Sequence, residues 1–461
     1  MPTADQSLPA GGPAREEIAR MELEHTIVSP VTARLLLVLF LTASAGVPIA
    51  EWTAIRAGRA EGIATAWSRL FALPSEIRSH GTAATGTADP GPWSFLVGAN
   101  RILIAGFAEF ERALEDEALI ARLLRPRTQV VMTGRLGAGN ERVYRGHEGW
   151  LFYRPDVEYV TGPGFLDPAQ LKRRVAPRLD SIATRQPAPG GIAAPDPRVA
   201  IAQFRRDLEA RGIALVVVPT PLKPGVHPEM LARDYADATG VLQNPSYRAF
   251  VGDLTRDGML VFDSSEALAS ARLAGPQYLA TDSHWRPEAM ETVAELLGSF
   301  IEARVRLPSR GDPGYQIERR EVSNTGDVAR MLDLPDDSPL FRLEAAWLRR
   351  VLQPDGSPWR TSREADVLLL GDSFSNIYSL ESMGWGTSAG FAEQLSYTLR
   401  RPVDRLVQND EGAFATRAML PRDPGRLDGK RVVVYQFAAR ELAFGDWKVI
   451  TLPAPRPQGS R

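Results

Sequence analysis

The sequence of 461 residues contains no cysteine. This absence excludes disulfide bonds, catalysis by a thiol and metal sites that are built from cysteine. It does not decide between an intracellular and an exported protein, because exported proteins often avoid free thiols as well.

The chain also has almost no net charge. The chain balances 54 lysines and arginines against 56 aspartates and glutamates, which leaves a net charge of −2. Such a chain has no overall positive field that would attract nucleic acid. No segment interleaves aromatic and basic side chains as a single-strand binder does. We therefore expect no nucleic-acid partner.

One uncharged apolar run stands out. Residues 35–50 carry no charge and lie between Arg34 and Trp52. The run is shorter than the about 20 residues that a spanning helix needs, but uncharged residues on either side lengthen it. The core of a signal peptide and a buried helix of a soluble protein are the competing interpretations. We favour an uncleaved membrane anchor over residues 31–52, because the run begins far from Met1 and is framed by Arg34 and Trp52.

The rest of the chain divides by composition. Residues 1–30 are rich in alanine, proline, glycine and charge, which predicts a disordered tail. Residues 53–140 are expected to form a helical stalk or cap, in which Phe107 and Phe110 fit an amphipathic helix that ends at Pro126. The main domain is expected over residues 141–450, and the proline-rich residues 451–461 are a second expected disordered tail.

The main domain alternates apolar strands with amphipathic helices. Strands are predicted over residues 213–218, 259–262, 367–370 and 432–436, and an opening strand over residues 149–153. Before the first of the apolar strands, a surface loop over residues 185–197 leads to a helix with Asp196 as its cap and an apolar face of Val199, Ile201, Phe204 and Leu208. This alternation predicts an α/β protein, a three-layer α/β/α domain with a mostly parallel sheet.

Two polar motifs suggest chemistry. Gly371 and Asp372 form a turn after an apolar strand, and the turn presents Ser373 at the carboxyl end of the sheet, where open α/β sheets place their sites. Asp282 and His284 precede a helix that begins at Pro287, so they are expected on a loop. Taken alone, the turn at Ser373 is more often an ordinary turn in which the serine caps the next helix. The Asp–His pair, taken alone, is more often a solvated hydrogen-bonded pair. Together they supply a hydroxyl nucleophile, a base and a carboxylate that orients the base.

These motifs resemble a known family. Gly371, Asp372 and Ser373 are similar to the nucleophile block of the SGNH hydrolases, in which this block comes first and an Asp-x-x-His block comes last. Here the order is reversed and the spacing is Asp282-x-His284, which resembles the permuted SGNH-like domain of the alginate O-acetyltransferase (exopolysaccharide O-acetyltransferase) family. Residues 146–153, 217–229 and 437–442 are also similar to that family. We find no counterpart of the glycine and asparagine blocks of ordinary SGNH enzymes.

The resemblance implies an O-acetyltransferase that is anchored in the inner membrane, with residues 1–30 in the cytoplasm and the catalytic domain in the periplasm. Ser373 would carry the acetyl group, His284 would be its base and Asp282 would orient the base. The acceptor would be an exopolysaccharide such as alginate, and a membrane-bound O-acyltransferase would be the partner that supplies acetyl groups. No cofactor is implied. A carbohydrate or acyl esterase and a non-catalytic polysaccharide-binding subunit are the two alternatives.

Further candidates lie near these motifs. Asn376 and Tyr378 are expected on the helix after Ser373, and Arg440 just past the last strand. All three are candidates for binding substrate or the oxyanion. The ordinary role is an exposed polar residue for Asn376 and Tyr378 and a structural ion pair for Arg440. Asp372 is expected to brace the turn. Lys223 and His227 follow a strand and are expected at the rim of the same crevice, with a turn residue as the alternative role of His227, which precedes Pro228. No metal site is expected, because only Asp282-x-His284 has ligand spacing.

Overall fold

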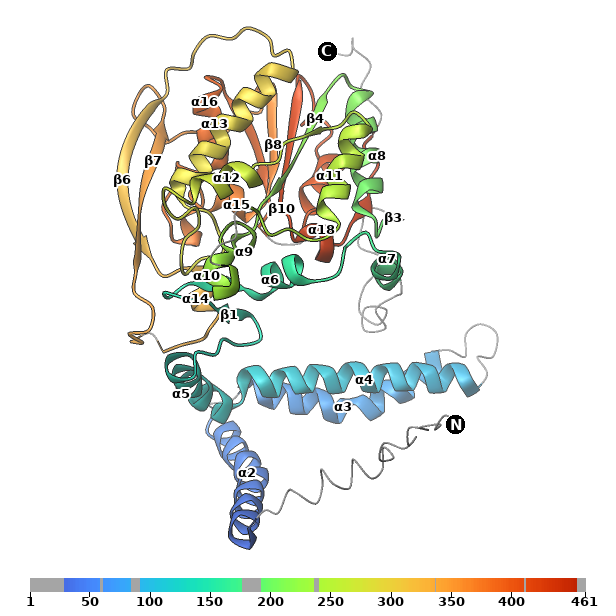
Figure 1. Cartoon of the computed structure of the whole chain (residues 1–461). Helices are drawn as coiled ribbons and strands as arrows, with labels where there is room; N and C mark the ends of the chain where they lie inside the picture. Colours follow the sequence, from blue (N-terminus) through green and yellow to red (C-terminus); the bar gives the residue numbers. More distant parts are fainter. Residues whose placement is uncertain are drawn as a thin grey trace, which may run out of the picture. The chain divides into compact units, whose positions relative to one another are not determined.

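A computed structural model describes residues 29–58, 61–83, 92–175, 192–235, 240–335, 337–409 and 412–453 of the chain (Figure 1). The chain forms two compact units, residues 1–124 and residues 125–461. The predicted tails over residues 1–30 and 451–461 lie almost entirely outside the described residues, as does most of the predicted loop over residues 185–197.

The first unit is helical. Helix α2 (Pro30–Arg56) begins at Ser29, whose hydroxyl accepts a hydrogen bond from the Thr32 N–H. Among the described residues it is the one helix that is long and apolar enough to cross a membrane, with a mean hydropathy of 1.9 over its most apolar window, which is exposed. Helices α3 (Glu61–Ala83) and α4 (Pro92–Glu117) lie side by side as an antiparallel hairpin (Figure 1). Glycine at position 106 lets the two helices approach closely, because a Cβ there would lie 2.5 Å from Leu73.

The predicted helix end at Pro126 is wrong. Helix α4 ends at Glu117, and helix α5 (Leu119–Arg135) continues through Pro126. A proline inside a helix removes one main-chain hydrogen bond and bends the axis, but it does not always stop the helix.

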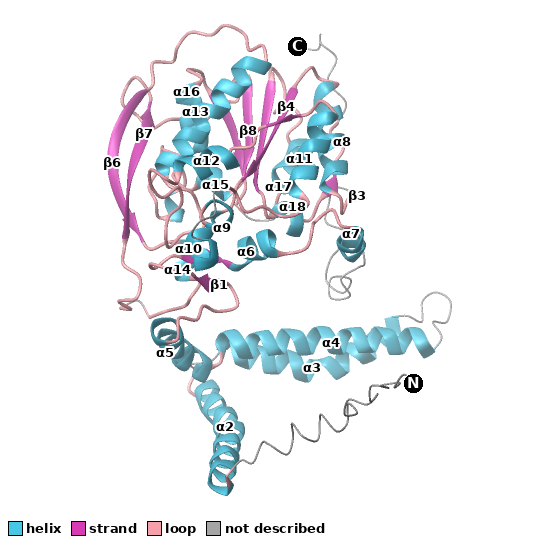
Figure 2. Cartoon of the chain, in the orientation of Figure 1, coloured by secondary structure: helices cyan, strands magenta, loops and turns pink. Residues whose placement is uncertain are grey.

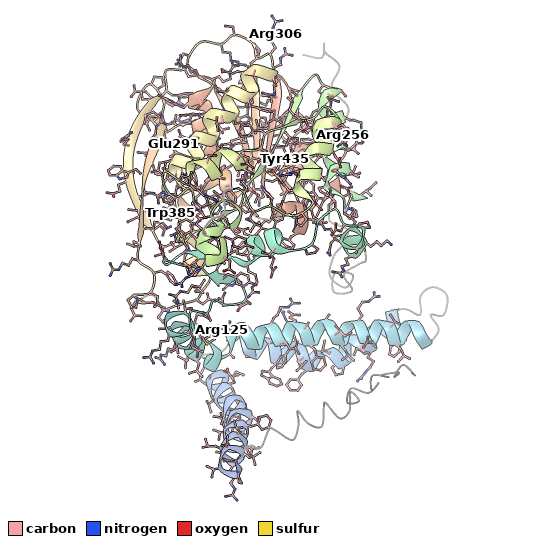
Figure 3. All side chains as sticks on the ribbon, in the orientation of Figure 1. Arg125, Arg256, Glu291, Arg306, Trp385 and Tyr435 are labelled. Atoms are coloured by element: carbon pink, nitrogen blue, oxygen red, sulfur yellow. The ribbon has the colours of Figure 1, made fainter. Side chains whose placement is uncertain are left out.

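The second unit is built on a parallel sheet of five strands in the order β5-β4-β10-β8-β9. The strands are β4 (Ala214–Thr220), β5 (Leu260–Val261), β8 (Val367–Gly371), β9 (Val403–Val407) and β10 (Val432–Ala438). The four strands predicted for this sheet are confirmed. Strand β9 was missed because Asp404 and Arg405 interrupt its apolar pattern, which suits its place at the edge of the sheet. In Figure 3, Tyr435 of β10 lies among the side chains of the interior.

Helices cover both faces of this sheet (Figure 2). Helix α13 (Pro287–Arg304) packs against α16 (Phe391–Thr398) on one face. On the other face, α8 (Pro197–Glu209) forms an ion pair with α11 (Tyr247–Arg256) through Arg198 and Asp253. The predicted three-layer α/β/α fold, preceded by an apolar helix and a helical segment, is therefore confirmed.

Helix α8 follows the sequence prediction closely. Asp196 is its cap and accepts a hydrogen bond from the Arg198 N–H. Phe204 and Leu208 are buried as expected, whereas Val199 is 51% exposed. Ala200 occupies the buried face in its place, because the face is set by the tertiary contacts and not by side-chain hydrophobicity alone.

Among the described residues, three antiparallel strand pairs lie outside the main sheet. Strand β1 (Val143–Arg145) pairs with β2 (Leu151–Tyr153), which corresponds to the predicted opening strand. Strand β6 (Gln316–Asn324) pairs with β7 (Glu344–Leu352). This second pair was not predicted, because β6 is almost entirely polar. The third is β3 (Ile192–Ala193) with β11 (Lys448–Val449).

Candidate active site

Strand β8 ends in the turn that carries Ser373. A Cβ on Gly371 would lie 2.4 Å from the Ser375 hydroxyl, so the turn requires glycine at this point. Asp372 caps the short helix α15 (Ser373–Asn376) by accepting a hydrogen bond of 2.9 Å from the Phe374 N–H. Its other oxygen accepts a bond of 2.6 Å from the Ala438 N–H at the end of β10. Asp372 thus braces the turn between two neighbouring strands, as the sequence predicted.

The loop before α13 brings Asp282 and His284 to this turn. Asp282 Oδ1 lies 2.7 Å from His284 Nδ1, and His284 Nε2 lies 2.9 Å from Ser373 Oγ. Both distances lie within the range of about 2.6–3.2 Å over which a catalytic base contacts its nucleophile by a hydrogen bond. The loop is as predicted, but its side chains are buried: Asp282 is 0% exposed and His284 is 3% exposed. A continuous chain of hydrogen bonds therefore joins the carboxylate, the imidazole and the hydroxyl.

Asp282 is held as a charged carboxylate. Its Oδ1 also accepts a hydrogen bond from the His284 N–H. Its Oδ2 accepts one from the Asp327 N–H at 3.0 Å and one from Nε1 of Trp385 (Figure 3) at 2.9 Å. Burial alone would raise the pKa of Asp282, but the hydrogen bond and charge of His284 hold that pKa below its usual value. For His284, burial would lower the pKa, but the hydrogen bond to Asp282 together with the negative charges of Asp282 and Asp327 outweighs burial and raises the pKa.

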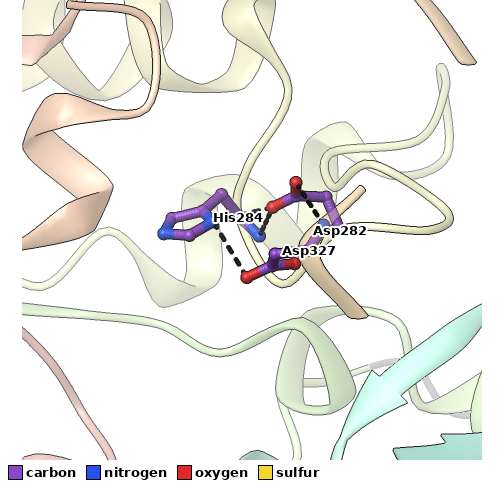
Figure 4. A group of neighbouring side chains, drawn as sticks. All are labelled: Asp282, His284 and Asp327. Atoms are coloured by element: carbon purple, nitrogen blue, oxygen red, sulfur yellow. Dashed lines mark hydrogen bonds and ion pairs between the residues drawn. The ribbon is translucent and has the colours of Figure 1, made fainter. Parts of the chain in front are cut away.

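A second carboxylate, Asp327, lies beside this pair (Figure 4). It begins helix α14 (Asp327–Arg330), and its Oδ2 is 3.8 Å from His284 Nδ1. Its two oxygens accept hydrogen bonds from the main-chain N–H and the hydroxyl of Ser283, at 2.7 and 2.6 Å. Burial and the charge of Asp282 raise the pKa of Asp327 to about 6. Asp327 could not be predicted from the sequence, because nothing in its local pattern separates it from an ordinary helix cap.

Asp282, His284 and Asp327 are close enough to consider a metal ion, since their ligand atoms lie within 4.8 Å of one another. The hydrogen bonds argue against it. Both oxygens of each carboxylate already accept N–H or O–H groups, and the free nitrogen of His284 is directed at Ser373. The donor set therefore fits a hydrogen-bonded catalytic group better than a cation site.

Lys223 lies beneath the loop and not at its rim. Its ammonium group is buried and donates to three carbonyl oxygens, those of Leu151 at 2.6 Å, Ala280 at 2.8 Å and Asp282 at 3.0 Å. Burial lowers the pKa of Lys223 to about 7. The side chain therefore ties the loop of Asp282 to strand β2. The expected place at a crevice rim is wrong for Lys223, because the strand end turns the side chain inward.

His227 is also structural in its contacts. Its Nδ1 lies 2.8 Å from Glu229 Oε1, and its Nε2 accepts a hydrogen bond of 2.9 Å from the Gln277 N–H. Since both ring nitrogens are occupied and the side chain is buried, His227 behaves as the turn residue that was its alternative role.

The three weaker candidates occupy different positions. Tyr378 is fully buried and its hydroxyl donates to the Trp285 carbonyl at 2.6 Å, so the expectation that it faces the site is wrong. Helix α15 ends at Asn376, and the chain then turns Tyr378 into the core. Asn376 Nδ2 donates to Asn409 Oδ1 at 2.9 Å, beyond the end of β9. Arg440 follows β10 and donates to Asp156 Oδ1 at 2.9 Å.

The main-chain N–H of Ser373 is the first of helix α15, so it has no acceptor within that helix. It donates none of the main-chain hydrogen bonds that the described residues form outside their helices and strands. Asn376 and Arg440 belong to the chain segments around it, because β8 lies between β9 and β10 in the sheet. Arg440 also has its guanidinium 6.0 Å from the ring of Phe374, the residue after Ser373.

A Ser–His–Asp chain of hydrogen bonds at the carboxyl edge of a parallel sheet, covered on both faces by helices, is typical of serine hydrolase-like α/β proteins, and the SGNH hydrolase-like proteins are one class of these. The chain belongs to the family described as "SGNH hydrolase-like domain, acetyltransferase AlgX", whose model matches residues 179–439. This match includes all three residues of the hydrogen-bonded chain.

Individual relatives are similar over the same region. The probable alginate O-acetylase AlgJ of Pseudomonas aeruginosa is 27% identical over 265 residues, which cover 56% of this chain and 66% of the relative. AlgJ of Pseudomonas putida is 26% identical over 252 residues, 52% of this chain and 61% of the relative. The chain thus matches less than two thirds of the length of these curated relatives.

Two solved structures are also similar. The O-acetyltransferase domain of Pseudomonas putida AlgJ matches with a TM-score of 0.49 and 20% identity, over 66% of this chain and 93% of that one. Pseudomonas aeruginosa AlgX matches with a TM-score of 0.42 and 18% identity, over 65% of each chain.

Proposed function

We propose that this chain is an O-acetyltransferase that transfers acetyl groups to hydroxyls of an exopolysaccharide through an acetyl-serine intermediate. The observation that carries the proposal is the 2.9 Å hydrogen bond between His284 Nε2 and Ser373 Oγ, with Asp282 on the other nitrogen of the ring. Membership of a family named for an acetyltransferase supports the acetyl group as the cargo.

The first half of the reaction loads Ser373. His284 Nε2 takes the hydroxyl proton as Ser373 Oγ bonds to the acetyl carbon of the donor. When the tetrahedral intermediate collapses, the bond to the leaving group breaks, and His284 returns the proton to that group. Asp282 keeps the other proton on Nδ1 and stabilises the imidazolium, in line with the raised pKa of His284.

The second half transfers the acetyl group. A sugar hydroxyl takes the place of the leaving group, and His284 removes its proton while the sugar oxygen attacks the acetyl carbon. The bond from Ser373 Oγ to that carbon breaks, and Oγ recovers its proton from His284. Water in the same position would give hydrolysis instead, which is the esterase alternative.

The carbonyl oxygen of the acetyl group becomes negatively charged in the tetrahedral intermediate and needs hydrogen-bond donors that stabilise it. The Ser373 N–H is the first, because no acceptor within its own short helix uses it. Arg440 and Asn376 are the candidates for the second donor, since they lie after β10 and β8 around the turn. Arg440 is the stronger one, because its guanidinium lies near Phe374 while only one of its N–H groups is used in the bond to Asp156.

The location is part of the proposal. Helix α2 would anchor the chain in the inner membrane, with the unit of residues 125–461 in the periplasm. Acetyl-coenzyme A is a donor of the cytoplasm, so a membrane-bound O-acyltransferase would supply the acetyl groups in the periplasm. The relatives are named for alginate, and a polysaccharide acceptor is proposed here by analogy with those names.

The test uses the purified full-length chain and an activated acetyl ester. We expect an acetyl adduct on Ser373 by intact mass and peptide mapping, slow release into water, and faster release with acetylated sugar when an oligosaccharide acceptor is present. Ser373→Ala should form no adduct. Fast hydrolysis that ignores every acceptor would favour the esterase, and a folded wild-type chain without an adduct would favour a binding subunit.

A further inference from the structure

The helical hairpin of α3 and α4 exposes an apolar face that the proposed reaction does not use. Five of the six exposed large apolar residues that are described in α4 form this face, and each is 38–57% exposed: Leu96, Val97, Leu103, Ile104 and Phe107. At 3.6 residues per turn they fall on one side of the helix, and Asn100 is the polar residue among them.

This face points away from α3. The opposite side of α4 packs on α3 through Gly106, which meets Leu73, and the hairpin is extended by the ring contact of Trp67 with Phe110. The exposed residues of α3 are instead mostly polar, including Ser68, Ser75, Glu76 and Arg78, with Phe71 as an apolar exception. The hairpin as a whole is therefore amphipathic, with α4 on its apolar side and α3 on its polar side.

The chain places this hairpin close to α2. Four residues separate the end of α2 at Arg56 from the start of α3 at Glu61. The last turn of α2 also packs on the hairpin, because Ala54 and Ala118 form a small apolar cluster together with Ile55 and Trp67. If α2 spans the membrane, the hairpin must therefore lie at the membrane surface.

The length of the polar end of α2 leaves room for one helix between α3 and the lipid. Glu51 and Arg56 mark the polar end of α2, and residues 51–56 extend about 9 Å at 1.5 Å per residue. Packed helices lie about 8–10 Å apart, so α3 would start one helix layer above the apolar part of α2. That layer is the space that α4 would occupy.

We propose that the outer face of α4 lies on the lipid surface of the membrane, with α3 on the water side of it. This inference rests on the proposed membrane anchor, but it does not depend on the acetyl-transfer reaction. Aromatic and aliphatic residues on one face are what an interfacial helix buries among lipid headgroups and acyl chains. The hairpin would then hold the chain at a fixed height and angle, which a single spanning helix cannot do.

The cysteine-free chain allows a direct test by nitroxide labelling of single cysteines. The full-length protein is placed in vesicles of phosphatidylethanolamine and phosphatidylglycerol. Ile104→Cys and Phe107→Cys report on the proposed face, and Leu39→Cys reports on α2. Ser75→Cys is the matched control, because the contact of Gly106 with Leu73 puts Ser75 at the same level of the hairpin as Ile104, on the polar side.

We expect labels at Ile104 and Phe107 to have a ratio of oxygen to nickel-chelate accessibility severalfold above that at Ser75, and close to that at Leu39. A lipid-like Leu39 with water-exposed labels at Ile104 and Phe107 overturns the position of α4. Labels there that are shielded from both reagents also overturn it, since the face then packs on protein, such as a second copy of the chain. A water-exposed Leu39 overturns the anchor itself.

Discussion

The main-chain N–H of Asp327 donates a hydrogen bond of 3.0 Å to Oδ2 of Asp282. The start of helix α14 therefore holds the carboxylate that orients His284. The neighbouring contacts strengthen this attachment, because the Gly326 N–H donates to the Thr281 hydroxyl and the Ala329 N–H donates to the Thr281 carbonyl. The geometry of the candidate site thus depends on a segment more than 40 residues further along the chain than His284.

Asp282→Asn is the most direct test of the proposed mechanism. The amide cannot hold the Nδ1–H tautomer of His284 as a carboxylate does, so loading of Ser373 should slow sharply. In the serine-protease triad the corresponding change costs a factor on the order of 10⁴. Stopped-flow measurement of acetyl-serine formation checks this, with circular dichroism to show that the variant is folded. An unchanged loading rate would remove Asp282 from the mechanism.

Asp327→Asn should change the pH dependence of the reaction. The charge of Asp327 raises the pKa of His284, which must be neutral to accept the proton of Ser373. Removing that charge lowers the pKa of His284, so the acidic limb of the kcat/KM profile should move to lower pH. Asp333→Asn is the matched control, because Asp333 pairs with Arg142 on the surface. A shift shared by both variants, or an unmoved acidic limb, would mean that Asp327 acts only as a structural support.

Gly326→Ala tests the attachment of the loop. A Cβ at this position would lie 2.2 Å from the Thr281 carbonyl oxygen and 2.5 Å from the Asp282 N, and both are main-chain atoms that cannot move alone. We expect a loss of about 1–3 kcal/mol in the free energy of unfolding, as in other overpacked sites, together with slower loading of Ser373. Gly275→Ala is the control, since a Cβ there meets nothing within 4 Å. Equal behaviour of the two variants in urea unfolding would contradict the prediction.

These contacts also explain what the sequence could and could not predict. The contact between Asp282, His284 and Ser373 could be predicted, because each lies where a strand or a helix boundary puts polar residues at the sheet edge, and their order and spacing resemble a family. Asp327 and Trp385 could not be found, since they reach Asp282 from segments with no pattern of their own. Periodicity located the strands of the core but not β6, whose residues are almost all polar.

The burial of individual side chains was the second feature that the sequence could not predict. Lys223 was expected to be exposed, as lysines usually are, and only the fold reveals three carbonyl oxygens around its ammonium group. Tyr378 was placed on the helix after Ser373, and the early end of α15 moved it into the core. Sequence patterns predict which face of a helix or strand is buried. The burial of Lys223 and Tyr378 depends instead on where a strand or a helix ends.

Lys223→Met should destabilise the fold and do so more strongly at high pH. Three buried carbonyl oxygens lose their donor, at a cost of about 1–3 kcal/mol each before relaxation. The pKa of Lys223 is lowered in the folded state to about 7, so its contribution to stability is fully present only above the unfolded pKa and is lost as the pH falls through 7. The deficit of the variant should therefore be larger at high pH than in mildly acidic buffer.

Urea unfolding of wild type, Lys223→Met and the surface control Lys172→Met across this pH range checks the sign. A deficit that is independent of pH would show that the pKa of Lys223 is not lowered by folding.

The pair of Arg440 and Asp156 separates a structural role from a catalytic one. Asp156 is buried, with 1% of its side chain exposed, and burial raises its pKa although Arg440 donates to it at 2.9 Å. Arg440→Met leaves this carboxyl without its cation, and loss of one partner of a buried pair costs about 3–5 kcal/mol. Asp156→Asn breaks the same pair but keeps the arginine.

If Arg440 donates to the oxyanion, Arg440→Met should lower kcat for loading of Ser373 well below the value for Asp156→Asn at matched stability, with little change in KM. Losing one oxyanion donor costs a factor of about 10²–10³ in the best-studied hydrolase. Arg440→Lys should restore part of the rate, because an ammonium group still offers donors and charge. Equal kcat in Arg440→Met and Asp156→Asn, measured below the unfolding midpoint of both, would assign the pair to stability alone and leave Asn376 as the candidate for the second donor.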